Sequence, residues 1–155
     1  MTTHLLYLHG FRSSPQSTKA QQMARWMAAQ RPDVHWWCPQ LPPSPRAAMA
    51  LIAAGCADWP AAGSAVIGSS LGGFYATALA NRHGWRAVLL NPAIFPERDL
   101  ARHIGEQSHW QDPQQRFYFR PEFIQELEEL QPGAPLWPER CCAIIAKGDE
   151  VLDWC

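Results

Sequence analysis

Short, continuously apolar runs alternate along this chain with longer segments of helical character. The apolar runs lie at residues 5–9, 34–38, 64–68, 86–91 and 141–148, and Gly or Pro stands at or just after the end of each. Helix-forming segments at 17–30, 45–59 and 71–84 separate the first four runs. Continuous apolar strands that alternate with helices are typical of a parallel sheet that is covered on both faces. The pattern therefore predicts an α/β fold with a mostly parallel sheet.

Residues 95–138 break this alternation. The segment is rich in Gln, Glu, Arg, Pro and aromatic side chains, and only one helix is expected in it, at 121–130. We interpret the segment as an insertion that forms a cap over the C-terminal edge of the sheet. Because 155 residues can bury one substantial core, we expect a single domain over residues 1–155 that includes this cap.

Charge and hydropathy narrow the range of partners. The formal net charge is -1, which gives no electrostatic reason to expect DNA, RNA or anionic lipid. The longest apolar runs are far shorter than a membrane span. The first residues, MTTHLLYLHG, lack the basic region and the cleavage site of a signal peptide. We therefore expect neither a nucleic acid nor a membrane as a partner.

The cysteines indicate a reducing compartment. Their number is odd, two of them are adjacent, and none forms a C-x-x-C pair; they are Cys38, Cys56, Cys141, Cys142 and Cys155. These features disfavour both a disulfide framework and a zinc site. We therefore expect a cytoplasmic protein without a bound metal.

Residues 68–72, Gly-Ser-Ser-Leu-Gly, match the pattern G-x-S-x-G with Ser70 at the centre. A register centred on Ser69 fails, because Ile67 stands where the first glycine is required. A nucleophile that is lifted out at the end of a strand needs a very sharp turn, and only very small residues fit two positions away. An apolar run precedes the motif and a helical segment follows it, so we predict that Ser70 is a nucleophile. A plain Gly-Ser turn is the alternative.

A serine hydroxyl needs a base to remove its proton and a third group to orient that base. On this kind of fold the chain order is Ser, then Asp or Glu, then His, and the acid follows a later strand. Asp149 stands directly after the apolar run 142–146, so we predict it as the acid. Glu150 and Asp153 are competitors, and a simple polar turn is the alternative interpretation.

Two backbone N–H groups are expected to form an oxyanion hole beside the nucleophile. One belongs to Leu71, which follows Ser70, and the other to Phe11, in the loop after the first apolar run. His9 and Gly10 lie in the same loop, and we expect them at the substrate pocket. We predict that His9 holds this loop in shape by local hydrogen bonds rather than acting as the base.

Four ordered motifs, LYLHGFRSSPQSTKA, GSSLGGFYATALA, LLNPAIFP and GDEVLD, resemble the small bacterial α/β-hydrolase esterases of the YqiA/YcfP-like group, the uncharacterised protein family UPF0227. The resemblance covers essentially the whole chain. It implies a cytoplasmic serine esterase or thioesterase that acts on small-molecule acyl esters without a metal or organic cofactor. By this resemblance Ser70 and Asp149 are the nucleophile and the acid, Asn91 and Pro92 lie near the pocket mouth, and 95–138 caps the acyl site.

The chain departs from that family in its histidines. Members of the family continue past GDEVLD through a helix and a last strand to a catalytic histidine. Here every histidine precedes Asp149; they are His4, His9, His35, His83, His103 and His109. We expect a fragment whose last helix, last strand and base lie beyond Cys155, and we expect little activity from the 155 residues alone.

Two alternatives to a fragment stay open. His103 or His109 of the cap could serve as the base, or the chain could be a non-catalytic binding protein that keeps only the hydrolase shell. The cap aromatics fit two interpretations equally, because they could line an acyl pocket or form the cap's own core. These aromatics are Trp110, Phe117, Tyr118, Phe119 and Phe123.

Overall fold

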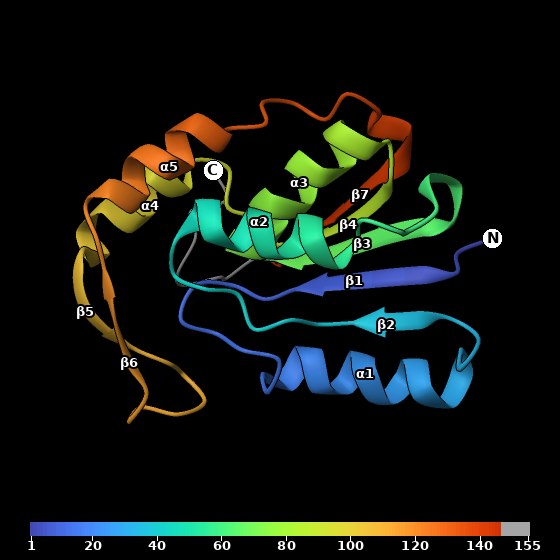
Figure 1. Cartoon of the computed structure of the whole chain (residues 1–155), viewed down its shortest axis with the longest axis horizontal. Helices are drawn as coiled ribbons and strands as arrows, with labels where there is room; N and C mark the ends of the chain where they lie inside the picture. Colours follow the sequence, from blue (N-terminus) through green and yellow to red (C-terminus); the bar gives the residue numbers. More distant parts are fainter. Residues whose placement is uncertain (147–155) are drawn as a thin grey trace.

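A parallel sheet of five strands forms the centre of the protein, for which the computed structural model describes residues 1–146. The strands are β1 (His4–Leu8), β2 (His35–Trp37), β3 (Ser64–Ser69), β4 (Arg86–Leu90) and β7 (Cys141–Ile144). They lie in the order β2-β1-β3-β4-β7, and every neighbouring pair is parallel (Figure 1). This arrangement confirms the predicted α/β class.

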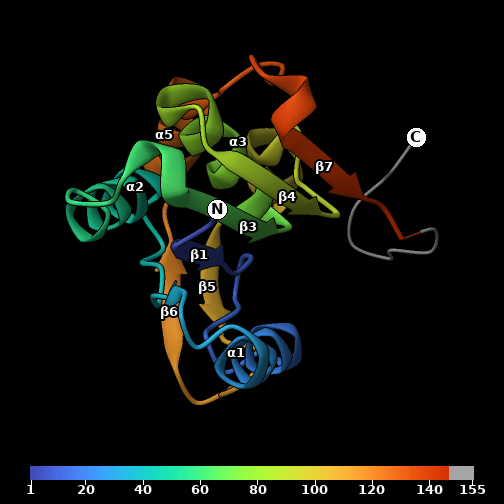
Figure 2. The ribbon, with the colours of Figure 1, turned by 90° about the vertical axis from the view of Figure 1, so that its right-hand side faces the viewer.

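Helices cover both faces of this sheet. Helix α1 (Thr18–Gln30) lies against one face, and α2 (Pro45–Gly55) and α3 (Leu71–His83) lie against the other (Figure 2). Successive residues of a strand point to opposite faces. Leu5 accordingly packs with Met27 of α1, whereas Leu6 joins the larger core that α2 and α3 cover. The continuous apolar runs in the sequence reflect this burial on both faces.

The helix ends follow local sequence signals. Ser17 caps α1 by accepting a hydrogen bond from the Ala20 N–H over 3.3 Å. The sequence also suggests a capping box between Thr18 and Gln21, but the Gln21 side chain donates to the Pro15 carbonyl instead. Ser44 caps α2 with Pro45 in the first helical position. Gly84 ends α3 with a φ of 68°.

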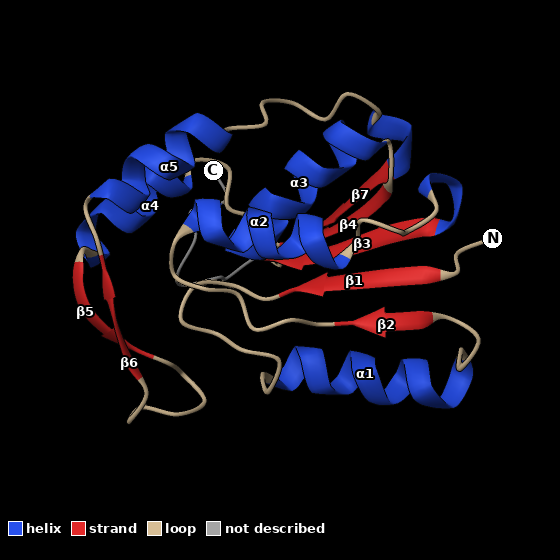
Figure 3. Cartoon of the chain, viewed as in Figure 1, coloured by secondary structure: helices blue, strands red, loops and turns tan. Residues whose placement is uncertain are grey.

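The segment 95–138, which we call the cap segment, lies beyond the carboxyl ends of the strands (Figures 1 and 3). It contains α4 (Pro96–Leu100), the antiparallel strands β5 (Gly105–Ser108) and β6 (Arg116–Phe119), and α5 (Glu122–Leu130). Short 3₁₀ turns lie at Ala61–Gly63, Ala101–His103 and Pro138–Arg140. The helix near 121–130 is therefore present, and the β5–β6 hairpin is an element that the sequence pattern does not predict.

Buried side chains and a capping carboxylate fix the cap segment on the main core. Leu127 of α5 and Phe119 of β6 are almost fully buried in that core. The Glu126 carboxylate accepts hydrogen bonds from the Ser44 hydroxyl (2.7 Å) and from the Arg46 N–H (3.2 Å), at the start of α2. An anion at a helix N-terminus is stabilising. Helix α5 therefore attaches the cap segment to the main core.

The cap aromatics divide between the two interpretations. Phe119 is buried, and Phe117 and Phe123 pack against the same core. Trp110 and Tyr118 are 60% and 58% exposed. Of the five, only Trp110 lines the large cavity beside Ser70, so within the described part of the chain most of these rings serve packing.

Candidate active site

Ser70 occupies the turn between β3 and α3. Its backbone φ is 55°, a conformation that costs a non-glycine residue about 1–3 kcal/mol. Backbone hydrogen bonds hold it there. The Ser70 N–H donates to the Leu90 carbonyl (3.0 Å), and the N–H groups of Gly73 and Ala93 donate to the Ser70 carbonyl (2.9 and 3.0 Å). The turn therefore has the strand–turn–helix geometry in which a nucleophile is presented above a sheet.

Two glycines make this turn possible through their lack of a side chain. A Cβ added to Gly68 would overlap the carbonyl oxygen of Gly72, and a Cβ added to Gly72 would overlap the carbonyl oxygen of Leu8. The obstacles are backbone atoms, which cannot rotate away as a side chain can. The spacing of the glycines around Ser70 is thus required by close contacts between β1, β3 and the start of α3.

Strained backbone gathers at the same end of the sheet. In residues 1–146 the non-glycine residues with positive φ are Arg12 (61°), Ser70 (55°) and Asn91 (42°). They follow β1, β3 and β4, which are three neighbouring strands. Such strain persists only where surrounding structure fixes it, and it concentrates at functional sites. The carboxyl ends of parallel strands are also where ligands of open α/β sheets bind.

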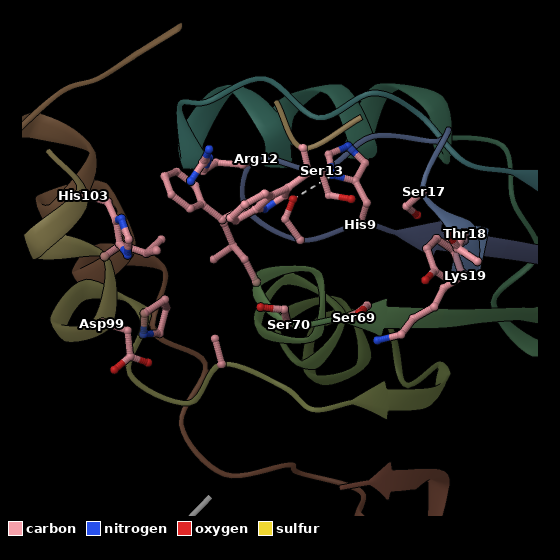
Figure 4. Close-up of a pocket in the computed structure, with 18 of the residues that line it drawn as sticks. His9, Arg12, Ser13, Ser17, Thr18, Lys19, Ser69, Ser70, Asp99 and His103 are labelled. Atoms are coloured by element: carbon pink, nitrogen blue, oxygen red, sulfur yellow. Dashed lines mark hydrogen bonds between the residues drawn. The ribbon is translucent and has the colours of Figure 1, made fainter. Parts of the chain in front are cut away.

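A cavity of about 590 Å³ lies beside Ser70, and this volume is within the range of ligand sites. The wall is formed by the loop after β1, the start of α1, the Ser70 turn, Ala93 and the part of the cap segment up to Trp110 (Figure 4). Arg12, Lys19 and Arg102 line it together with one carboxylate, Asp99. The described wall therefore carries a net positive charge, which favours negative charge that develops on a bound group.

Two residues of the cavity wall, Phe11 and Leu71, have backbone N–H groups without a hydrogen bond in the described part of the chain. Leu71 is the first residue of α3, where the N–H groups have no partner inside the helix. These are the two donors that the sequence predicts for an oxyanion hole.

His9 is buried and fully engaged in shaping the loop after β1. Its Nδ1 hydrogen-bonds the Gly10 carbonyl (2.9 Å), and its Nε2 accepts from the Leu41 N–H (2.9 Å). Because Nε2 accepts a hydrogen bond, the proton must sit on Nδ1 and the ring is neutral. Burial lowers the pKa of His9 below its ordinary value and favours that neutral form. His9 lines the cavity, and its contacts are those of a residue that holds the loop.

The two histidines of the cap segment, His103 and His109, line different cavities. His103 lines the same cavity as Ser70 and packs on the Phe11 ring at a centroid distance of 5.6 Å. Burial, together with the charges of Arg102 and Arg12, lowers its pKa. His109 hydrogen-bonds the Ser13 carbonyl through Nδ1 (3.4 Å) and lines only a small neighbouring cavity. No hydrogen bond joins Ser70 to a histidine within residues 1–146.

Two of the predicted pocket residues support the turn instead of lining the cavity. Asn91 turns its side chain toward β7, where Oδ1 accepts from the Ala146 N–H over 2.7 Å. Pro92 lies against Gly73, so that a Cβ on this glycine would come within 2.7 Å of the proline ring. Neither residue is part of the cavity wall, whereas Gly10 and Ala93 are. The expected place of Asn91 and Pro92 near the pocket mouth stays a prediction.

The predicted catalytic acid lies outside the described residues. Asp149, the predicted acid, falls outside residues 1–146, as do its competitors Glu150 and Asp153. Within those residues no group of three His, Cys, Asp or Glu side chains could hold a metal ion. None of the described helices has the length and apolarity to cross a membrane.

The architecture is similar to two solved structures. A proposed hydrolase from Agrobacterium vitis S4 has a TM-score of 0.66 and 14% identity, over 94% of this chain and 79% of that one. Alpha/beta hydrolase domain-containing protein 10 from mouse has a TM-score of 0.62 and 14% identity, over 95% and 81% of the two chains. The parallel sheet and the turn at its centre therefore define an α/β-hydrolase fold.

The family is a narrower assignment than the fold. A family model matches residues 4–155, and the chain belongs to the uncharacterised protein family UPF0227. This match confirms the resemblance that the four motifs carry. Since the family is uncharacterised, membership specifies no reaction, and the chemistry has to be argued from the site.

Sequence reasoning overlooks Arg12 as a residue of this site and leaves Trp110 undecided between an acyl pocket and the cap's own core. Arg12 has a positive φ, which is rare for arginine, and its neighbours in the sequence give no signal for it. Trp110 reaches the cavity only because the β5–β6 hairpin folds back on the loop after β1. Long-range packing of this kind has no local signature in the sequence.

Proposed function

We propose that this protein is a serine hydrolase that cleaves small-molecule acyl esters or thioesters, with Ser70 as the nucleophile. One observation carries the proposal. Ser70 stands on a strained strand–turn–helix corner beside a cavity that Phe11 and Leu71 also line, and no hydrogen bond within residues 1–146 uses the N–H group of either residue. A nucleophile and two oxyanion donors are two of the parts that acyl transfer by a serine requires, and a base is the third.

The reaction follows from these roles. The Ser70 Oγ attacks the acyl carbonyl carbon and gives its proton to a base, while the N–H groups of Phe11 and Leu71 stabilise the oxyanion. The bond to the leaving oxygen or sulfur then breaks, and the leaving group takes that proton. Water attacks the acyl-serine in the second half, so that a carboxylic acid and free Ser70 are released.

The acid and the base complete the proposed triad. We assign the acid to Asp149 and take the base to be a histidine that follows it in chain order, as expected for this fold. His103 is the described histidine that competes for the role of base, because it lines the same cavity as Ser70. Its contact with Phe11 and the lack of a hydrogen bond to Ser70 favour a packing role.

Covalent labelling together with ester hydrolysis tests the proposal. We expect the full-length protein to hydrolyse 4-nitrophenyl butyrate and to react with a fluorophosphonate probe at Ser70, identified by peptide mass spectrometry. Ser70→Ala should lower kcat by at least about 10³-fold and abolish labelling.

Ser64→Ala is the matched control, because Ser64 begins the same strand at its opposite end and bonds only the Pro60 carbonyl. It should retain labelling. Labelling at Ser69, or equal turnover in Ser70→Ala, would overturn the assignment of the nucleophile. If the folded full-length protein neither reacts with the probe nor hydrolyses the ester, the non-catalytic binding protein becomes the better interpretation.

A further inference from the structure

Arg12 joins the loop after β1 to the β5–β6 hairpin of the cap segment. Its Nε donates to the Ser108 carbonyl over 2.6 Å, and its Nη2 donates to the Ser108 hydroxyl over 3.2 Å. The guanidinium lies over the Trp110 ring, 3.9 Å from the centroid. The backbone N–H of Trp110 donates to the Arg12 carbonyl over 2.8 Å. Side chain and backbone of one residue are therefore both attached to the hairpin.

The residues on either side of Arg12 make the same connection. The Phe11 ring packs edge-on against Phe119 and Phe117, at centroid distances of 5.1 and 5.8 Å. The Ser14 hydroxyl donates to the Gln111 side chain over 3.2 Å. The loop that carries the Phe11 N–H thus contacts the cap segment at several residues. The shortest of these polar contacts is the one from Arg12 Nε to the Ser108 carbonyl.

The backbone of Arg12 is strained, and its side chain explains why the strain persists. A φ of 61° is adopted far more easily by Gly or Asn than by arginine. An arginine offers what neither of those residues does, because its planar fork can bond Ser108 and stack on Trp110 at the same time. Strain of this kind is retained where it supports function. The contacts that Arg12 makes with the cap segment therefore offset the cost of its positive φ.

We propose that Arg12 is a positioning residue that holds the Phe11 N–H in the oxyanion hole by fixing its loop to the β5–β6 hairpin. The inference rests on the proposed hydrolase function and adds a dependence of the oxyanion hole on the cap. The hole is complete only when the hairpin is docked on Arg12. Arg12 and Trp110 also line the cavity. A bound acyl group would therefore touch the Arg12–Trp110 contact that positions the oxyanion hole.

Substitution by residues that accept positive φ separates this role from a purely structural one. Arg12→Asn and Arg12→Gly relieve the backbone strain but lose the contacts of the guanidinium, so these two effects on stability oppose each other and we expect only a small change in the melting temperature. The loss of the hairpin contact should lower kcat for 4-nitrophenyl butyrate by about 10- to 100-fold, since small misplacements of catalytic groups have effects of this size. KM should change by less than about threefold, because the interaction acts in the transition state.

Trp110→Ala provides a second arm. It should lower kcat in the wild-type background and have little further effect in Arg12→Asn, because both substitutions break the same contact. Arg116→Asn is the matched control. Arg116 lies in β6, and its side chain forms an ion pair with Glu106 of the hairpin (2.8 Å) but is not part of the cavity wall, so kcat of this variant should match that of the wild type.

The outcomes distinguish this inference from the proposed function. If wild type hydrolyses no ester and binds no fluorophosphonate, the hydrolase proposal itself fails. If wild type is active and Arg12→Asn keeps the wild-type kcat, the positioning role is overturned. A lower melting temperature in Arg12→Asn, with kcat per labelled serine unchanged, would also overturn it and leave Arg12 a structural residue.

Discussion

The backbone N–H of Ser70 donates to the carbonyl oxygen of Leu90 over 3.0 Å, which ties the turn after β3 to the last residue of β4. Leu90 ends its strand just before Asn91, another residue with positive φ. The Ser70 carbonyl in turn accepts from the Ala93 N–H. Two strained corners therefore stabilise each other, and the position of Ser70 depends on backbone contacts from β4 and from the loop that follows it.

Gly72→Ala is expected to damage the fold before it affects the chemistry. Its Cβ would overlap the backbone carbonyl of Leu8 in β1, so β1 and α3 would have to move apart. Overpacking of a tight core typically costs about 1–3 kcal/mol, and a backbone obstacle puts this variant at the upper end. Urea denaturation should show a lower midpoint with an unchanged slope. A midpoint within error of the wild type would contradict the close contact.

Gly10→Ala should affect rate more than stability. A Cβ on Gly10 would lie 3.1 Å from the Ser70 Cβ and 3.5 Å from its Oγ, contacts that a small shift can relieve. The added methyl would crowd the face of Ser70 that must receive the acyl carbonyl. We expect kcat/KM for 4-nitrophenyl butyrate to fall by about tenfold or more, with a smaller loss of stability than in Gly72→Ala. Equal losses in both properties would refute a specific effect on the nucleophile.

The strands and helices of the main sheet could be predicted because their signals are local. The apolar run before Ser70, the glycines around it and the helix formers after it agree on one strand–turn–helix unit, and the observed close contacts explain that spacing. The catalytic role of Ser70 stays a prediction. Asp149 stays one too, since it lies outside the described residues.

The cap segment could not be predicted in the same detail. Strand β5 is Gly-Glu-Gln-Ser, which has no apolar alternation, and its pairing with β6 is set by packing of Phe119 and by the contacts of Arg12. The pocket role expected for Asn91 stays a prediction. Its side chain accepts a hydrogen bond from the Ala146 N–H, 55 residues further along the chain, and the sequence gives no local signal for this contact.

His103→Gln distinguishes the two candidates for the base. If a histidine later in the chain is the base, this variant loses only the packing of His103 on Phe11, and kcat should fall by less than about tenfold. His83→Gln, in the last turn of α3 and away from the cavity, is the control. A loss in His103→Gln close to that of Ser70→Ala would instead make His103 the base. Steady-state kinetics on both variants would decide.

The buried His9 predicts a specific loss of stability in mild acid. Its pKa in the folded protein is lower than the ordinary value of 6.5, chiefly because burial disfavours the charged ring, and the charge of His109 adds to this effect. The unfolded chain therefore binds a proton more readily than the folded one. Stability from the neutral ring is present above pH 6.5 and is lost as the pH falls toward and through the lower folded pKa.

Comparison of wild type with His9→Gln isolates this contribution from those of the other histidines. The glutamine does not titrate, so the variant should be less stable at pH 8 but should lose less stability between pH 6.5 and pH 5. The difference between the two urea midpoints should therefore shrink as the pH falls. Protonation also breaks the bond from the Leu41 N–H to Nε2, which loosens the loop that carries Phe11. Ester hydrolysis by wild type should then decline over the same pH range. Parallel stability profiles for the two proteins would contradict a lowered pKa of His9 in the folded protein.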